Sequence, residues 1–214
     1  MNYKTIAKKF NMHGCKYYNE GLYDEAITAF THSIFFDESG NAKYLVNRGT
    51  VYYSKEEFNL ALRDFDLAIK YFADFPLSYV KRGYCFLEKY EYNLQQGLKK
   101  DEYLKMAICD FNKAIDLGHM EPEVFVNRAT SYNLLEDSVN AFCDISRAIE
   151  LFKSPNVNAL LNRGITYAEW GDWIHAEIDF NRAIRAASIN GHEIDEVKKR
   201  IKDIYDYHNM QLSK

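Results

Sequence analysis

Apolar residues recur along this chain at spacings of three and four, with polar residues between them. That period places the apolar side chains on one face of an α-helix, and no segment requires a β-strand. The chain has only 3 prolines and 10 glycines, so the breaks between helical stretches are short. The pattern predicts an all-α fold of helices joined by tight turns.

One short sequence appears four times at similar intervals. The hexapeptide NRGTVY begins at residue 47, and its echoes are KRGYCF from 81, NRATSY from 127 and NRGITY from 162. A second block follows each copy, reading ALRDFDLAI from 61, AICDFNKAI from 107, AFCDISRAI from 141 and AEIDFNRAI from 176. Weaker copies of the two blocks, MHGCKY from 12 and AITAFTHSI from 26, precede them. A period of about 34 residues with two helices per unit predicts a solenoid of antiparallel helix pairs.

Small residues recur where the two helices of a pair are expected to cross. The first helices carry Gly14, Gly49, Gly83, Ala129 and Gly164, and the second helices carry Ala26, Ala61, Ala107, Ala141 and Ala176. Larger side chains follow four residues after these alanines, namely Phe30, Phe65, Phe111, Ile145 and Phe180. Because small residues let two backbones approach closely, a bulky side chain in place of Gly49 is expected to overpack the crossing.

Arginine and aspartate recur together with the same blocks. The arginines are Arg48, Arg82, Arg128 and Arg163, and the aspartates are Asp64, Asp110, Asp144 and Asp179. A guanidinium and a carboxylate that return at fixed positions predict bidentate ion pairs joining helices within or between repeats.

This framework of small residue, aromatic, alanine and phenylalanine resembles the tetratricopeptide repeat. The matching units span residues 7–41, 42–75, 76–121, 122–156 and 157–190. The resemblance implies one domain over residues 1–214, a right-handed superhelix whose concave groove is lined by the first helix of each pair. A segment over 191–214, with Ile194, Val197, Ile201, Ile204 and His208 on one stripe, is expected to cap the last repeat.

The third unit is longer than the others. Gly83 and Ala129 are 46 residues apart, whereas Gly49 and Gly83 are 34 apart. The added stretch has no proline, so we expect both helices to be lengthened by nearly two turns, with Gly97 near the tip. The extension is either a tolerated insertion at a solvent edge or a protruding contact surface with tyrosine anchors, for which the candidates are Tyr90, Tyr92 and Tyr103.

The first letter of each hexapeptide lies away from the packing face of its helix. These residues are Asn47, Asn127 and Asn162, with Lys81 in the third unit. The resemblance implies that they line the groove, where an amide can bridge the N–H and C=O groups of an extended peptide. Neighbouring candidates on the same face are Lys43, Thr50, Tyr84, Thr130 and Asn158. The alternative is that asparagine merely suits a solvated helix face.

Some members of the family grip the C-terminal carboxylate of a chaperone with lysines, asparagines and an arginine on this face. Lys8, Asn47 and Lys81 resemble part of that clamp. Met12 and Leu77, however, occupy positions where the clamp would need asparagine and lysine. A co-chaperone function of this kind is therefore the lesser alternative.

Charge and composition limit the expected partners, compartment and cofactors. The formal net charge is -4 with both signs interspersed, so neither nucleic acid nor an anionic membrane is an expected partner. Nowhere do 18 uncharged apolar residues occur in a row, which favours a cytoplasmic protein. The four cysteines form no CxxC pair, and we expect them to be small buried hydrophobic residues, with no metal or cofactor.

Motifs of enzymes are missing from the sequence. It contains no HExxH, no glycine-rich phosphate loop and no GxSxG. We therefore predict that the protein is not an enzyme. We expect a protein-interaction module, scaffold or adaptor that binds a peptide segment or helix of another protein in its concave groove. The alternative is a homo-oligomer that self-assembles through the third hairpin or the C-terminal helix.

Overall fold

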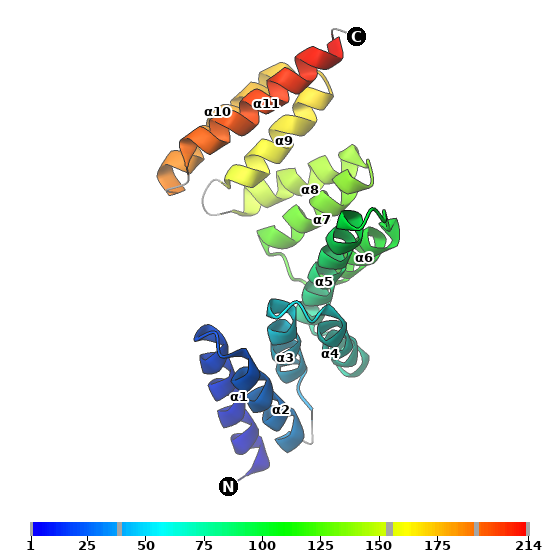
Figure 1. The fold of residues 1–214 in the computed structure, drawn as a ribbon, viewed down its shortest axis with the longest axis vertical. Helices are drawn as coiled ribbons and strands as arrows, with labels where there is room; N and C mark the ends of the chain where they lie inside the picture. The colour runs from blue at the N-terminus through cyan, green and yellow to red at the C-terminus, as the bar shows by residue number, and fades with distance from the viewer. Residues whose placement is uncertain (1, 38–39, 153–155, 191–192, 213–214) are drawn as a thin grey trace. The chain divides into compact units, whose positions relative to one another are not determined.

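The computed structural model describes residues 2–37, 40–152, 156–190 and 193–212. Within these ranges it contains eleven α-helices and no strand, which confirms the all-α prediction (Figure 1). Five antiparallel pairs are followed by one further helix. The helices are α1 (Tyr3–Asn19), α2 (Tyr23–Phe36), α3 (Ala42–Ser54), α4 (Phe58–Tyr71), α5 (Pro76–Gln95), α6 (Asp101–Asp116), α7 (Pro122–Leu134), α8 (Ser138–Leu151), α9 (Val157–Glu169), α10 (Trp173–Asn190) and α11 (Ile194–Leu212).

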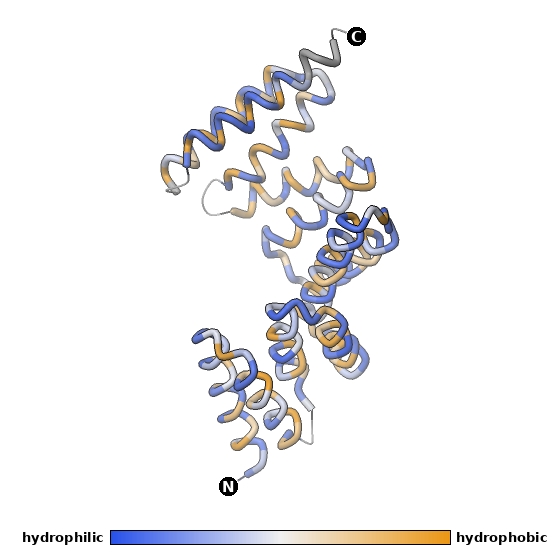
Figure 2. Tube along the Cα trace, viewed as in Figure 1, coloured by the Kyte–Doolittle hydropathy of each residue, from blue (hydrophilic) through white to orange (hydrophobic). Residues whose placement is uncertain are grey.

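The helices form two compact units. The first, Met1–Met120, holds the three pairs α1–α2, α3–α4 and α5–α6. The second, Glu121–Lys214, holds α7–α8, α9–α10 and α11. Along each described helix, hydrophobic residues recur in short patches and not as continuous runs (Figure 2). No helix in the described ranges combines the length and the apolar character needed to cross a membrane.

Each pair turns in the same way. A residue with positive φ stands two positions after the end of the first helix. The N–H of the residue that follows it donates back to a carbonyl in the last turn of the helix, as Leu22 does to Tyr17 at 2.9 Å. This is the Schellman arrangement, which satisfies helix carbonyls that would otherwise lack a donor. The positive-φ residues are Gly21, Glu56, Gly97, Glu136 and Gly171.

The crossings show why glycine is needed. A Cβ atom added at Gly49 would lie 2.6 Å from Cε1 of Phe65, a ring that is fully buried. The corresponding distance at Gly164 is 2.6 Å, to Phe180. Atoms at that distance overlap, so the ring occupies the space that a side chain on the first helix would need. This confirms the expected close approach.

The third pair is extended unequally. Gly97 follows Gly83 by 14 residues, whereas Glu56 follows Gly49 by 7, so α5 gains two turns. Helix α6 has 16 residues against the 14 of α4. The expected extension of nearly two turns is therefore correct for α5 and wrong for α6, because some of the added residues form the loop instead. Gly97 lies at the tip, as predicted, with φ of 75°.

Helix α11 covers apolar side chains of the last pair. Val197 and Ile201 are buried in one cluster with Ala186 and Ala187 of α10. Tyr205 stacks on Trp173 with ring centroids 5.2 Å apart. Residues 191, 192, 213 and 214 of the expected cap, and the side chain of His208, lie outside the described part of the chain.

The cysteines differ from the expectation. Cys85 is buried and Cys15 is half-buried, but Cys109 and Cys143 are exposed on the second helices of their pairs. The prediction that all four are buried hydrophobic residues is wrong for these two. Their positions follow Ala107 and Ala141 by two residues, which turns them away from the crossing.

Candidate functional site

Ion pairs fix the first helix of four repeats against its own second helix. In each, Nε and Nη2 of the arginine donate to the two carboxylate oxygens of one aspartate, at 2.6–2.9 Å. The pairs are Arg48–Asp64, Arg82–Asp110, Arg128–Asp144 and Arg163–Asp179. The bidentate pairing predicted from the sequence is confirmed, and these residues serve the fold.

Arg82 also joins neighbouring repeats. Its Nη1 donates to Asp66 on α4 at 2.7 Å, in addition to the pair with Asp110 on α6. Burial raises the pKa of Asp110, although its hydrogen bonds from Arg82 oppose that shift. The hydrogen bonds from Arg82 therefore lower the free energy of the charged form of this buried carboxylate. One guanidinium thus ties three helices together beside the candidate binding face.

Asn47 is tied into a contact between repeats. Its amide nitrogen donates to Oδ1 of Asn11 at 2.8 Å and lies 3.8 Å from Sγ of Cys15, both on α1. A partner would have to displace these contacts to use the same donor. Asn47 therefore holds α3 against α1, which differs from the predicted role of a free groove residue.

The other predicted polar residues are partly committed to local bonds. Asn127 donates to the carbonyl oxygen of Glu123 at 2.7 Å. Asn158 accepts a hydrogen bond from Arg200 of α11 at 3.1 Å. The Thr50 and Thr130 hydroxyls donate to backbone carbonyls of their own helices at 2.8 and 3.0 Å. Asn162 is half-buried on α9, and Lys43 is exposed on α3.

Lys81 is the exceptional member of this set. It lies half-buried on α5, and its Nζ is 5.8 Å from the centroid of the Tyr84 ring. Burial lowers the pKa of its ammonium group. None of the ion pairs in the described residues includes Lys81. A cation that has lost water without gaining a carboxylate is suited to bind a partner's anion or carbonyl.

Neighbouring first helices carry equivalent candidate positions in the first unit. Helix α3 contacts both α1 and α5. Asn47 and Lys81 hold equivalent positions on α3 and α5, as do Thr50 and Tyr84. The ring of Tyr84 packs against Phe111 at 5.7 Å, which fixes it beside Lys81. The site in this unit therefore joins one half-buried cation, one ring and the α3 surface.

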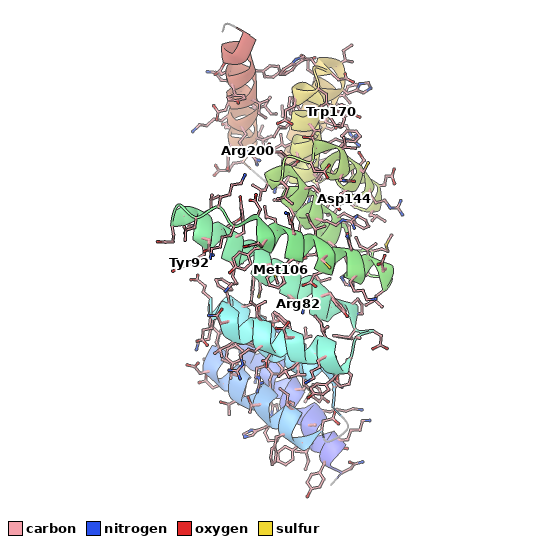
Figure 3. The ribbon with its side chains drawn as sticks, turned by 90° about the vertical axis from the view of Figure 1, so that its right-hand side faces the viewer. Arg82, Tyr92, Met106, Asp144, Trp170 and Arg200 are labelled. Atoms are coloured by element: carbon pink, nitrogen blue, oxygen red, sulfur yellow. The ribbon has the colours of Figure 1, made fainter. Side chains whose placement is uncertain are left out.

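The three tyrosines of the extended pair have different environments. Tyr90 is 2% exposed, so its predicted role as a protruding anchor is wrong. Tyr103 is half-buried and stacks on Phe86 at 6.4 Å. Tyr92 alone of the three is well exposed, at 61% (Figure 3). Helical spacing explains this difference, because Tyr90 is seven residues after Gly83 and so returns to the packing face.

Cavities beside Tyr92 are lined by residues outside the predicted site. The turn between α3 and α4 contributes Glu56, the start of α4 contributes Phe58, and α5 contributes Glu88 and Glu91. The two sets are about 30 residues or more apart in the chain, so no local pattern unites them. No three His, Cys, Asp or Glu side chains in the described ranges are grouped so that they could hold a metal ion.

Comparison with family models finds no match to this chain. Among curated proteins, the small glutamine-rich tetratricopeptide repeat-containing protein of Dictyostelium discoideum is 31% identical over 80 residues, 37% of this chain and 24% of that protein. RNA polymerase II-associated protein 3 of Xenopus laevis is 33% identical over 109 residues, 51% of this chain and 16% of that protein. The matches thus span a quarter or less of these relatives.

Solved structures match far more of the chain. TTC0263, a thermophilic TPR protein of Thermus thermophilus, has a TM-score of 0.64 and 16% identity, covering 93% of this chain and 98% of that one. MamA from Desulfovibrio magneticus has a TM-score of 0.69 and 13% identity, covering 85% and 95%. YrrB, described as a TPR protein with an unusual peptide-binding site, has a TM-score of 0.63 and 17% identity, covering 83% and 84%. Together with the helix pairs, these matches show that the chain folds as a tetratricopeptide-repeat solenoid.

Proposed function

We propose that this chain is a protein-interaction module that binds an extended segment of another protein on its first-helix face, with Lys81 meeting a carboxylate or carbonyl of that segment. Proteins with this fold are generally interaction modules, and YrrB has a peptide-binding site. The observation that carries the proposal is the half-buried Lys81 ammonium, which has no carboxylate partner among the described residues.

The free energy of a desolvated cation explains why Lys81 would favour binding of a partner. Removing an ammonium group from water is unfavourable unless an opposite charge or a carbonyl compensates it. A bound segment would supply that group, while the Tyr84 ring would cover an apolar side chain of the segment. Bound and free protein would therefore differ most in the environment of Lys81.

The asparagines support the proposal to different degrees. The amide nitrogen of Asn47 already donates to Asn11, so the proposal does not depend on Asn47. The Oδ1 atom of Asn127 can still accept a bond while its nitrogen donates to Glu123. Asn162 and Asn127, both in the second unit, would hold the backbone of a segment there.

A binding experiment with selected peptides tests this proposal. Peptides chosen from a random-sequence phage library on the wild-type chain would be labelled, and their affinities measured by fluorescence anisotropy. Lys81→Met is the test variant, and Lys113→Met, an exposed lysine on α6, is the matched control. Because a charge-assisted contact contributes about 1.5–3 kcal/mol, the test variant should bind about tenfold more weakly or worse.

The outcomes separate the alternatives. Equal affinity of all selected peptides for wild type and Lys81→Met would contradict the proposal. If amidation of the peptide C-terminus abolishes binding, the site takes a terminal carboxylate, as the co-chaperone alternative requires. Sedimentation velocity of the purified chain tests self-assembly, since a homo-oligomer would sediment faster as its concentration rises.

A further inference from the structure

The added turns of α5 create a recess within the first unit. They carry α5 past the turn between α3 and α4, and Tyr92 lies near this far end while Arg82 lies toward the other (Figure 3). Two adjoining cavities, of about 450 and 800 Å³, open between the turn and the extension. Glu56, Phe58 and Tyr92 line both of them. We call this region the α5 overhang.

The smaller cavity of the α5 overhang is acidic. Glu56, Glu88 and Glu91 line it, and no lysine, arginine or histidine does. None of these three carboxylates takes part in an ion pair of the described residues. Glu88 accepts a hydrogen bond from the Tyr53 hydroxyl at 2.7 Å, which fixes its position. Three carboxylates without an ion-pair partner line this one recess, which favours a cation there.

The larger cavity adds Glu57 and Lys89, whose side chains already have polar partners. Glu57 lies 3.1 Å from Nζ of Lys55, and Nζ of Lys89 donates to Asn59 at 2.9 Å. This cavity adds apolar surface through Leu60 and the ring of Tyr103. A ligand that enters from the acidic side can therefore extend an uncharged part into the larger cavity.

The geometry points to an arginine-containing peptide as the ligand of the α5 overhang. An arginine presents a flat, permanently charged guanidinium that can stack on the exposed Tyr92 ring while it donates to carboxylates such as Glu56 and Glu91. A guanidinium can donate to more than one carboxylate at once, because its N–H groups point in different directions. This site is separate from the Lys81 face and does not rest on it.

Direct binding of a defined probe tests the inference. The probe is a fluorescein-labelled peptide of alternating glycine and arginine, with lysine and glutamine twins, measured by anisotropy at low and physiological salt. The test variant is Glu56→Gln with Glu91→Gln. Its control, Glu193→Gln with Glu196→Gln at exposed positions beside and within α11, changes the net charge equally. The test variant should lose about tenfold in affinity, and the control less than about twofold.

A second pair of variants tests the aromatic contact. Tyr92→Ala should weaken binding of the arginine probe about fivefold and of the lysine twin less, since the guanidinium stacks more extensively. Tyr207→Ala, an exposed tyrosine on α11, is the matched control. Equal affinity of the wild type and both α5-overhang variants for the arginine probe would overturn the inference. The Lys81→Met variant should bind the probe like wild type, so the two proposals fail or succeed separately.

Discussion

The size of one residue at each crossing is matched to the size of its partner. Four first helices carry glycine where the second helix places a phenylalanine, as with Gly49 and Phe65. The fourth pair carries Ala129 instead, and it packs with Ile145, which lacks the ring. One methyl group on the first helix is therefore accommodated by removal of an aromatic ring from the second. The sequence pattern alone contains this exchange, but only the 2.6 Å distance explains it.

This matching predicts that the effect of Gly49→Ala on stability changes sign with the residue at position 65. Gly49→Ala should destabilise the wild type by about 1 kcal/mol, because overpacking of about 1–3 kcal/mol exceeds the gain in helix propensity. In a Phe65→Ile background, which removes the obstructing ring, the same Gly49→Ala change should be neutral or stabilising. Chemical denaturation of the four proteins in this cycle measures both effects. An equal effect of Gly49→Ala in the two backgrounds would show that the ring is not the cause.

We expect the buried charge of Lys81 to lower the folding stability of the free protein by an amount that depends on pH. Burial lowers the pKa of this lysine in the folded state, so its charge favours the unfolded state below the folded pKa. Lys81→Met should therefore unfold at the same or a higher temperature near neutral pH. The stability difference between the two proteins should shrink as the pH rises from the folded pKa through the ordinary value of 10.5. A lower melting temperature for Lys81→Met near neutral pH would contradict this explanation.

At the scale of the element, the turn after the first helix is conserved in geometry but not in residue type. Its positive-φ residue is glycine in three pairs and glutamate in two. A left-handed conformation is unfavourable for a residue with a side chain by about 1–2 kcal/mol. Glu56 and Glu136, with φ of 61° and 63°, therefore store strain that Gly21, Gly97 and Gly171 avoid.

Exchanging these residue types should have opposite effects. Glu136→Gly should stabilise the chain by about 1 kcal/mol, less any gain in the entropy of the unfolded state. Gly97→Ala should destabilise it by a similar amount for the same reason. Thermal unfolding monitored by circular dichroism measures both changes. If the two substitutions shift the midpoint in the same direction, the left-handed strain does not govern these turns.

The helices and their pairing could be predicted from the sequence, because a period repeated five times leaves little choice of face. The division of the insertion could not be predicted in the same way. Seven added residues rotate α5 by nearly two full turns, short by about 20°, so the turn at Gly97 leaves from almost the same face as in other pairs. The second helix has no such constraint at its start, and it gains fewer residues.

Over the chain as a whole, the sequence predicts which positions lie on the first-helix face better than it predicts their individual contacts. Lys81 was identifiable as the one cation in a row of asparagines, but its desolvation depends on the packing of α5. The partner of Asn47 is Asn11, a full repeat earlier, and the acidic recess joins Glu56 to Glu91 across two repeats. Contacts between repeats depend on how neighbouring helices pack, and the motif of a single repeat does not specify that packing.

The proposed function requires that the first-helix face, and not another surface, receives the partner segment. Photo-crosslinking tests this requirement, using a selected peptide with a benzoylphenylalanine at each position in turn and mass spectrometry to identify the joined residue. We expect crosslinks to first-helix residues near Lys81, such as Thr50 and Tyr84, and their loss in Lys81→Met. Crosslinks confined to the second helices α2, α4 and α6, and unchanged in that variant, would contradict the proposed function.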